Sequence, residues 1–153
     1  IAKAVVLALF VPLIISSGGN SGSQAASLII RAMALKELQL RDWWYVMKKE
    51  FVSGLLLGGI LGLLGFIRIM IWQETGIYDY GPYWLWVALS VSTSLLFIVL
   101  WGTLSGSLIP FLLRKMKLDP AAASAPFVAT LVDVTGLIIY FSVSALFLAG
   151  KLL

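Results

Sequence analysis

The run from Val46 to Trp72, VMKKEFVSGLLLGGILGLLGFIRIMIW, decides the fold. It carries no charged side chain between Glu50 and Arg68, and apolar residues and glycines fill nearly every position between them. A helix needs roughly 20 predominantly apolar residues to cross about 30 Å of hydrocarbon. The run therefore predicts a transmembrane helix, and we expect the rest of the chain to pack around it.

Three more apolar stretches accompany this run. The 153 residues are 61% hydrophobic and 12% charged, with a mean hydropathy of +1.02, whereas a soluble domain is about half apolar and a quarter charged. We therefore predict an all-α integral membrane protein, a single transmembrane domain over residues 1–153. Its bundle of four long transmembrane helices is expected at about residues 1–34, 46–72, 84–113 and 120–150.

The chain has no cysteine and no histidine. Disulfides, thiolate metal sites and thiol catalysis are therefore excluded, and the commonest general base and transition-metal ligand are missing. The net charge of +4 could suggest a nucleic-acid partner. Because the basic residues cluster in short loops between apolar runs, we attribute the charge to membrane topology and expect no nucleic acid.

The charged loops predict the orientation in the membrane. Loops 36–49 and 114–117 are rich in lysine and arginine, whereas residues 73–82 carry two acids and no base. The positive-inside rule places both basic loops in the cytoplasm of a cell whose inner (plasma) membrane holds the chain, and both chain ends outside. An outside N-terminus would make sense if an earlier membrane span precedes Ile1.

Two loop sequences have the composition of helix starts. The run Asp42-Trp43-Trp44 is typical of a capped helix that lies at the membrane surface and leads into the second span. Asp119-Pro120 is typical of the start of the last span, because Asp caps helices and Pro suits a first helical turn.

The first apolar stretch is interrupted by the polar segment SSGGNSGSQ at residues 16–24. Polar residues in mid-membrane are unfavourable unless they face protein or water, and we expect the three glycines to weaken or break the helix and free backbone carbonyls. Asn20 and Gln24 share a face if the segment is helical, so they could contact ion-bound water. Hydrogen bonding between helices is an equally open alternative.

Gly54, Gly58 and Gly62 lie four residues apart and form two overlapping G-x-x-x-G steps. Such a stripe lets another helix approach closely, so we interpret it as a packing surface. A second patch of small residues lies within residues 102–107.

Asp133 is an ionisable residue in an otherwise apolar span. Intramembrane acids usually mark ion or substrate pathways, so we interpret it as functional; the alternative is an acid paired with Arg31 or Arg68. Both arginines are otherwise expected to snorkel to an interface, although Arg31 could instead bond to a neighbouring helix and hold the pore in one state. The residues that share the helical face of Asp133 are small or polar for the most part: Pro126, Ala129, Thr130, Gly136, Leu137, Tyr140 and Ser144.

A single carboxylate is a poor match for a dication, whereas two copies across a symmetry axis would neutralise it. We therefore predict a homodimer with the pore on or near the axis. Oxygen ligands without Cys or His point to Mg²⁺, Ca²⁺ or Mn²⁺, and Mg²⁺ keeps several waters and is often held by one or two carboxylates. A largely hydrated Mg²⁺ at Asp133, near the hydroxyl of Thr130, fits this pattern. Glu50 could gather cations at the cytoplasmic end of its span or pair with Lys or Arg.

Several ordered motifs resemble the membrane domain of the MgtE magnesium transporters. The segment GGNSGSQAASLIIRA, residues 18–32, resembles their second membrane helix. Residues 119–124, Pro126 and residues 129–140 also match, as do LRDW at 40–43, KE at 49–50 and PFLLRK at 110–115. The resemblance covers nearly the whole chain. Two departures are Ala125, where relatives often have Asn, and an outer loop at residues 73–83 that looks longer.

The resemblance implies a homodimer with five membrane helices per subunit and a pore lined by the second and fifth. This chain would then hold spans two to five, without the first helix and without the cytoplasmic Mg²⁺-sensing domains expected in a full-length protein. The acid at Asp133 would be the central pore ligand for Mg²⁺, acting largely through water. Backbone oxygens near Gly19 and Ala129 would be secondary contacts, and Glu50 would lie near the cytoplasmic pore mouth.

The leading hypothesis is therefore a Mg²⁺ channel in the lipid bilayer, driven by the ion gradient and the membrane voltage, with Mg²⁺ as the transported ion. The alternative is a secondary transporter that exchanges Mg²⁺ for another cation, because broken segments and mid-membrane acids occur in both classes. An enzyme is not expected, because the sequence offers no strong nucleophile–base pair.

Overall fold

The computed structural model describes residues 2–151, and every regular element in that part of the chain is helical. Four segments are long and apolar enough to cross a membrane. These findings confirm the predicted all-α membrane bundle; Ile1, where the first span was expected to begin, lies outside the described residues. The elements are α1 (Ala2–Ala8), α2 (Val11–Ala34), η1 (Leu40–Asp42), α3 (Trp43–Thr75), α4 (Trp84–Lys115), η2 (Pro120–Ala122) and α5 (Ala125–Leu148).

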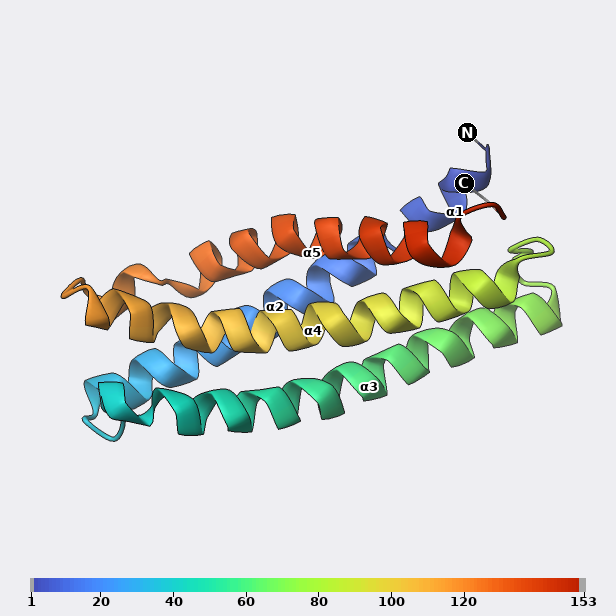
Figure 1. Ribbon diagram of the computed structural model, residues 1–153. Helices are drawn as coiled ribbons and strands as arrows, with labels where there is room; N and C mark the ends of the chain where they lie inside the picture. The colour runs from blue at the N-terminus through green and yellow to red at the C-terminus, as the bar shows by residue number, and fades with distance from the viewer. Residues whose placement is uncertain (1, 152–153) are drawn as a thin grey trace.

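The central helix of the bundle is α4 (Figure 1). It packs along α2, α3 and α5, and α2 also packs against α5. Its buried positions run from Val87 to Phe111, almost its whole length. Helix α3 therefore contacts the rest of the bundle mainly through α4, whereas α2 and α5 contact each other as well as α4.

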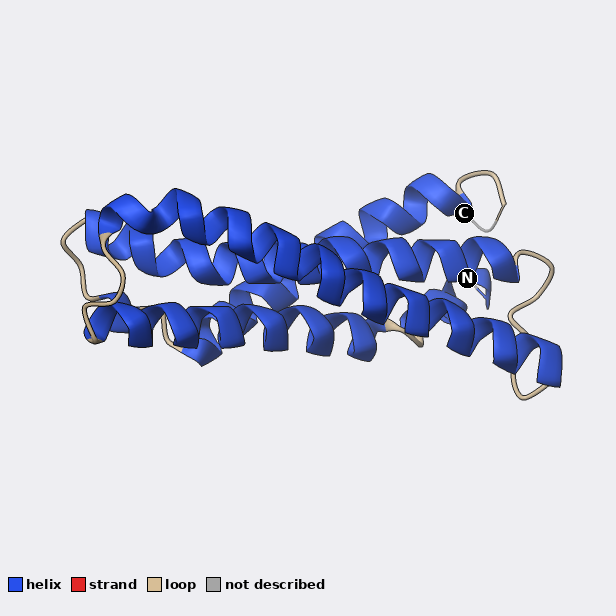
Figure 2. Ribbon diagram, turned by 90° about the horizontal axis from the view of Figure 1, so that it is seen from below, coloured by secondary structure: helices blue, strands red, loops and turns tan. Residues whose placement is uncertain are grey.

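The loops gather at the two ends of the helices (Figures 1 and 2). The loops after α2 and after α4 lie together at one end, and these carry the basic residues. Residues 76–83 lie at the other end, with α1 and the end of α5. The grouping of the two basic loops on one side, expected from the order of spans, is thus present.

The first membrane segment bends at residues 9–10 and not at its glycines. Helix α2 runs unbroken through Gly18, Gly19 and Gly22, so the prediction that these glycines break the helix is wrong. The bend has a local cause in Pro12, which lies in the first turn of α2. Proline has no N–H to donate to the carbonyl four residues earlier, so the helical ladder is interrupted there.

The glycines of α2 are explained by their contact with α4. A Cβ atom built at Gly102 would lie 2.7 Å from the carbonyl oxygen of Gly18, and one built at Gly106 would overlap the carbonyl of Gly22. The two backbones approach too closely for side chains at these positions. Tertiary packing thus keeps α2 helical although glycine disfavours a helix by about 1 kcal/mol relative to alanine.

The Gly54, Gly58 and Gly62 stripe packs α3 against α4, as predicted. A Cβ atom at Gly58 would lie 2.8 Å from the carbonyl oxygen of Leu96, and one at Gly62 would lie 2.7 Å from that of Ser92. Such distances allow no side chain without a shift of backbone, so the interpretation of this stripe as a packing surface is confirmed.

Two helix starts differ from their predictions. The Asp42 carboxylate accepts a 2.8 Å hydrogen bond from the N–H of Gln39 and closes η1, so it does not cap α3 through its side chain. The Asp119 carboxylate accepts from the N–H of Ala121 at 2.9 Å and caps η2. The last long helix begins only at Ala125, because a side-chain bond two residues ahead favours a turn over a continuing helix.

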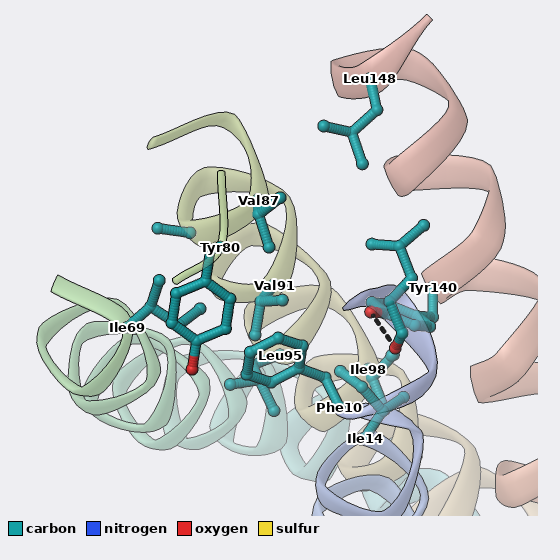
Figure 3. Close-up of a cluster of buried hydrophobic side chains, with 12 residues drawn as sticks. Phe10, Ile14, Ile69, Tyr80, Val87, Val91, Leu95, Ile98, Tyr140 and Leu148 are labelled. Atoms are coloured by element: carbon teal, nitrogen blue, oxygen red, sulfur yellow. Dashed lines mark hydrogen bonds between the residues drawn. The ribbon is translucent and has the colours of Figure 1, made fainter. Parts of the chain in front are cut away.

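A buried cluster at the end near residues 76–83 joins the long helices (Figure 3). Phe10, at the bend, stacks on Tyr80 of the loop at residues 76–83, with the ring centroids 6.0 Å apart. The Tyr140 hydroxyl of α5 donates a 2.8 Å hydrogen bond to the carbonyl of Leu7, close to the end of α1. The bend is therefore held both by the 76–83 loop and by α5.

Candidate ion site

Asp133 lies on α5 and faces Gly19 of α2. Its Oδ1 atom is buried and has no hydrogen-bond partner, whereas the residue as a whole is half-buried. A Cβ atom at residue 19 would come 2.5 Å from this oxygen, so the carboxylate fits there because residue 19 has no side chain. An unpaired carboxylate oxygen out of contact with water is unfavourable. The chemistry of the position therefore favours a cation.

Ala129 and Thr130 lie one turn before Asp133 on the same helix. Ala129 is half-buried, with its Cβ 3.6 Å from where a Cβ of Gly19 would be. Thr130 is exposed, and its hydroxyl donates to the carbonyl of Pro126 at 3.0 Å. The hydroxyl oxygen still has lone pairs to offer to water or a cation.

The backbone oxygens near Gly19 and Ala129 belong to continuous helices. They are not released by a helix break, in contrast to the expectation from the glycines. A carbonyl oxygen in a helical hydrogen bond keeps a second lone pair, which can accept from a water molecule. A contact between these backbone oxygens and a hydrated ion thus stays a prediction, in which a water molecule of the ion lies between the ion and the oxygen.

An exposed polar strip runs along α2 on the side next to Gly19. Its members, Ser16, Asn20, Gln24 and Ser27, are spaced by three or four residues and so share one face. The Asn20 amide donates to the Ser16 hydroxyl at 3.2 Å. Hydrocarbon cannot satisfy such groups, so this strip requires water or another polar surface beside it.

Glu50 lies apart from this group. It is half-buried on α3, a helix that packs on α4, and its backbone carbonyl is 3.4 Å from the Thr103 hydroxyl. Within one chain, the fold brings together Asp133, Gly19 and Ala129, with the α2 strip on the neighbouring face of its helix, but it does not add Glu50 to them.

The alternative of an acid paired with arginine finds no support in these contacts. The Arg68 guanidinium lies 4.2 Å from the ring centroid of Trp72 and 5.9 Å from that of Phe10. Arg31 is exposed in the last turn of α2. Among residues 2–151, no group of three or more acidic, His or Cys side chains could hold a metal. Asp133 is therefore a sparse site, which suits an ion that keeps its water.

Sequence reasoning missed the apolar residues that set the spacing between α2 and α5. A Cβ atom at Gly18 would lie 3.1 Å from Val132 Cγ1, and one at Gly22 would lie 3.3 Å from Val128 Cγ1. Both valines are fully buried. The available signal was their spacing of four, one position away from Ala129 and Asp133. The buried face of α5 that packs on α2 is therefore centred on these valines, and Asp133 lies at the edge of that face.

Sequence reasoning also missed a polar contact between α4 and α5. The indole N–H of Trp101 donates to the Thr135 hydroxyl at 2.8 Å. Thr135 follows Asp133 by two residues, so this bond fixes the rotation of α5 close to the carboxylate. A tryptophan in mid-span, away from both interfacial belts, was the signal that could have indicated it.

Comparison with known proteins matches the chain to one family. The model of the MgtE family, described as a divalent cation transporter, matches residues 11–143. Three similar proteins carry the name magnesium transporter MgtE. The Thermus thermophilus protein is 48% identical over 142 residues, which cover 93% of this chain and 29% of that protein. The Enterococcus faecalis and Bacillus subtilis proteins are each 32% identical, over 97% and 95% of this chain and 31% and 30% of theirs.

The chain thus spans about three-tenths of the length of the relatives it matches. The matched region contains Asp133, Gly19, the polar strip of α2 and the seam between α2 and α5.

Proposed function

Because the chain belongs to the MgtE family of divalent cation transporters, we propose that it carries Mg²⁺ across a membrane along the face shared by α2 and α5. Asp133 is the central ligand of this path. One observation carries the proposal: Asp133 Oδ1 is buried without a partner, on a multi-pass membrane protein, opposite a glycine. An ionisable group within a membrane span is by default a functional one.

Two copies of the chain complete the path. One carboxylate balances half the charge of Mg²⁺, and a two-fold axis beside α2 and α5 brings a second Asp133 to the same ion. The exposed strip with Asn20 and Gln24 supports this arrangement, because a second copy or enclosed water would satisfy these amides where lipid would not. Glu50 is proposed to lie near the cytoplasmic mouth of the path rather than beside Asp133, because α3 packs on α4.

The ion passes in a largely hydrated form. Mg²⁺ dehydrates reluctantly and is usually held by one or two carboxylates with several waters. The donors beside the path match that need: the Thr130 hydroxyl, the Asn20 and Gln24 amides, and carbonyls of helices that can bond to water. A site that binds Mg²⁺ without its water would need more carboxylates than residues 2–151 bring together.

The ion gradient and the membrane voltage drive the transport. Moving one elementary charge across 100 mV is worth about 2.3 kcal/mol, and Mg²⁺ carries two. The basic loops at residues 36–49 and 114–117 face the cytoplasm by the positive-inside rule. Arg31 lies exposed at that end of α2.

Mg²⁺ flux into proteoliposomes tests the proposal. The Asp133→Asn variant keeps the shape of the side chain and removes its charge, so we expect flux to fall about tenfold or more, equal to about 1.4 kcal/mol or more in barrier height. The matched control, Glu74→Gln, removes one exposed acid near the outer loop and leaves flux within about twofold. Equal flux from the parent and the Asp133→Asn variant, at equal insertion, contradicts the proposal.

Electrical recording separates the channel from the exchanger. A channel gives a Mg²⁺ current when Mg²⁺ is the only permeant cation on either side. An exchanger needs a second cation on the opposite side, so a flux that stops when this cation is removed overturns the channel mechanism but keeps Asp133 as a ligand.

A further inference from the structure

An apolar groove runs along the outside of the bundle over α4, between α3 and α5. It lies at the end that carries the basic loops and encloses about 890 Å³. Trp44 and Phe51 of α3 form one wall, Trp101 and Leu108 of α4 form the floor, and Leu131 of α5 forms the other wall. The groove is separate from Asp133, which faces α2.

The mouth of the groove is basic. Lys48 lines the groove itself, with its Nζ 5.4 Å from the Trp44 ring centroid. A second hollow of about 430 Å³ continues from it, sharing Leu108 and Leu112, and adds Arg41 and Lys115. Three cationic side chains thus border the groove and its continuation at the membrane surface: Arg41 from η1, Lys48 from α3 and Lys115 from the end of α4.

The length of the groove matches one leaflet of a bilayer. From Trp101 to Leu112, the axial rise of α4 at 1.5 Å per residue is about 16 Å. Half of the hydrocarbon core is about 15 Å thick. A membrane-spanning helix would need a groove along the full thickness, whereas one acyl chain needs only its own leaflet.

We propose that this groove binds an anionic phospholipid of the cytoplasmic leaflet. An acyl chain lies against Trp101 and Leu108, and the phosphate lies between Lys48, Arg41 and Lys115. Basic pockets between membrane helices on the cytoplasmic side have the chemistry that holds acidic head groups. Asp42, the acid that follows Arg41 in the chain, accepts a hydrogen bond from the N–H of Gln39.

Native mass spectrometry of the purified protein with added phosphatidylglycerol or phosphatidylcholine tests this proposal without any transport measurement. We expect the parent to retain phosphatidylglycerol about tenfold or more over phosphatidylcholine, and the triple variant of Arg41, Lys48 and Lys115 to Gln to lose that preference. The matched control carries Lys49→Gln and Lys117→Gln with Lys36→Gln, three basic residues near the same membrane surface that do not line the groove. It keeps the preference.

Three results would overturn the proposal. The first is equal preference in the parent and the groove variant. The second is an equal loss in the control variant, which would mean a diffuse effect of charge. The third is a parent that retains no phosphatidylglycerol. In that case, labelling of a Leu108→Cys variant with a membrane-soluble maleimide identifies the reason: protection means that a protein segment fills the groove, and rapid labelling means that only bulk lipid passes over it.

Discussion

The Oδ1 atom of Asp133 lies against Gly19, where a Cβ atom of residue 19 would come within 2.5 Å of it. The carboxylate belongs to α5 and the glycine to α2, so the contact joins the two helices of the proposed ion path. Helices that approach so closely leave no space for a methyl group unless the carboxylate moves. Position 19 therefore controls where the carboxylate points.

Gly19→Ala is expected to lower Mg²⁺ flux by displacing the Asp133 carboxylate. The added methyl forces the side chain away from its place, at a cost of about 1 kcal/mol for an off-rotamer torsion. Thermal unfolding in detergent should show a corresponding loss of stability. The Gly59→Ala variant is the control, because the nearest atom to its new Cβ is Leu96 Cδ1 at 3.9 Å.

A double-mutant cycle decides whether the effect of Gly19→Ala acts through Asp133. In the Asp133→Ala background the clashing oxygen is absent, so the stability cost of Gly19→Ala should largely disappear, with a coupling of about 1 kcal/mol between the two changes. An undiminished cost in that background would show that the alanine disturbs the packing of α2 in some other way.

The sequence was sufficient to single out Asp133 as an unpaired acid within a span and to predict the packing role of Gly54, Gly58 and Gly62; the role of Asp133 as an ion ligand stays a prediction. A lone acid in an apolar span and glycines at a spacing of four each have one dominant physical meaning, which needs no knowledge of the partner helix. These two features are local, so they are visible in one chain segment at a time.

The glycines at Gly18 and Gly22 could not be interpreted in the same way. Their intrinsic preference indicates a break, whereas their contact with Gly102 and Gly106 keeps α2 helical. The contact depends on which faces of α2 and α4 meet, and helix propensity carries no information about that. The bend at residues 9–10 was missed for the related reason that Pro12 lies in a run that is otherwise uniformly apolar.

Gly58→Ala is expected to destabilise the bundle through the α3–α4 contact. The new Cβ would lie 2.8 Å from the backbone oxygen of Leu96, so the two helices must separate, at a cost of about 1–3 kcal/mol. Thermal unfolding in detergent measures this loss of stability. Gly59→Ala, on the adjacent and more open position, should be neutral or slightly stabilising because alanine favours the helix. Equal effects at the two positions would argue against close packing at Gly58.

Tyr140→Phe is expected to loosen the bend of the first membrane segment. The variant removes the buried hydrogen bond to the carbonyl of Leu7, with a loss of about 1 kcal/mol in the free energy of unfolding. Faster hydrogen exchange at residues 7–10 would locate the effect at the bend. Tyr45→Phe, at an exposed site, serves as the control. Unchanged exchange in the Tyr140 variant would mean that packing alone holds the bend.

The loop at residues 76–83 is expected to lose stability in acid through Asp79. The hydrogen bonds from the Gln73 side chain and the N–H of Gly81 hold the pKa of Asp79 below its ordinary value of 3.8. A carboxylate with a lowered pKa stabilises the folded state above its unfolded pKa, and this contribution is lost as the pH falls through the folded pKa. The Tm difference between the parent and Asp79→Asn should therefore be constant from neutral pH down to about pH 4 and shrink below it. The hydrogen bond from Gln73 contributes most to the lowered pKa of Asp79. In the Gln73→Met variant, the stability that the ionised Asp79 contributes should therefore be lost at a higher pH. A Tm difference that stays constant through pH 3 would show that these hydrogen bonds do not favour the ionised carboxylate.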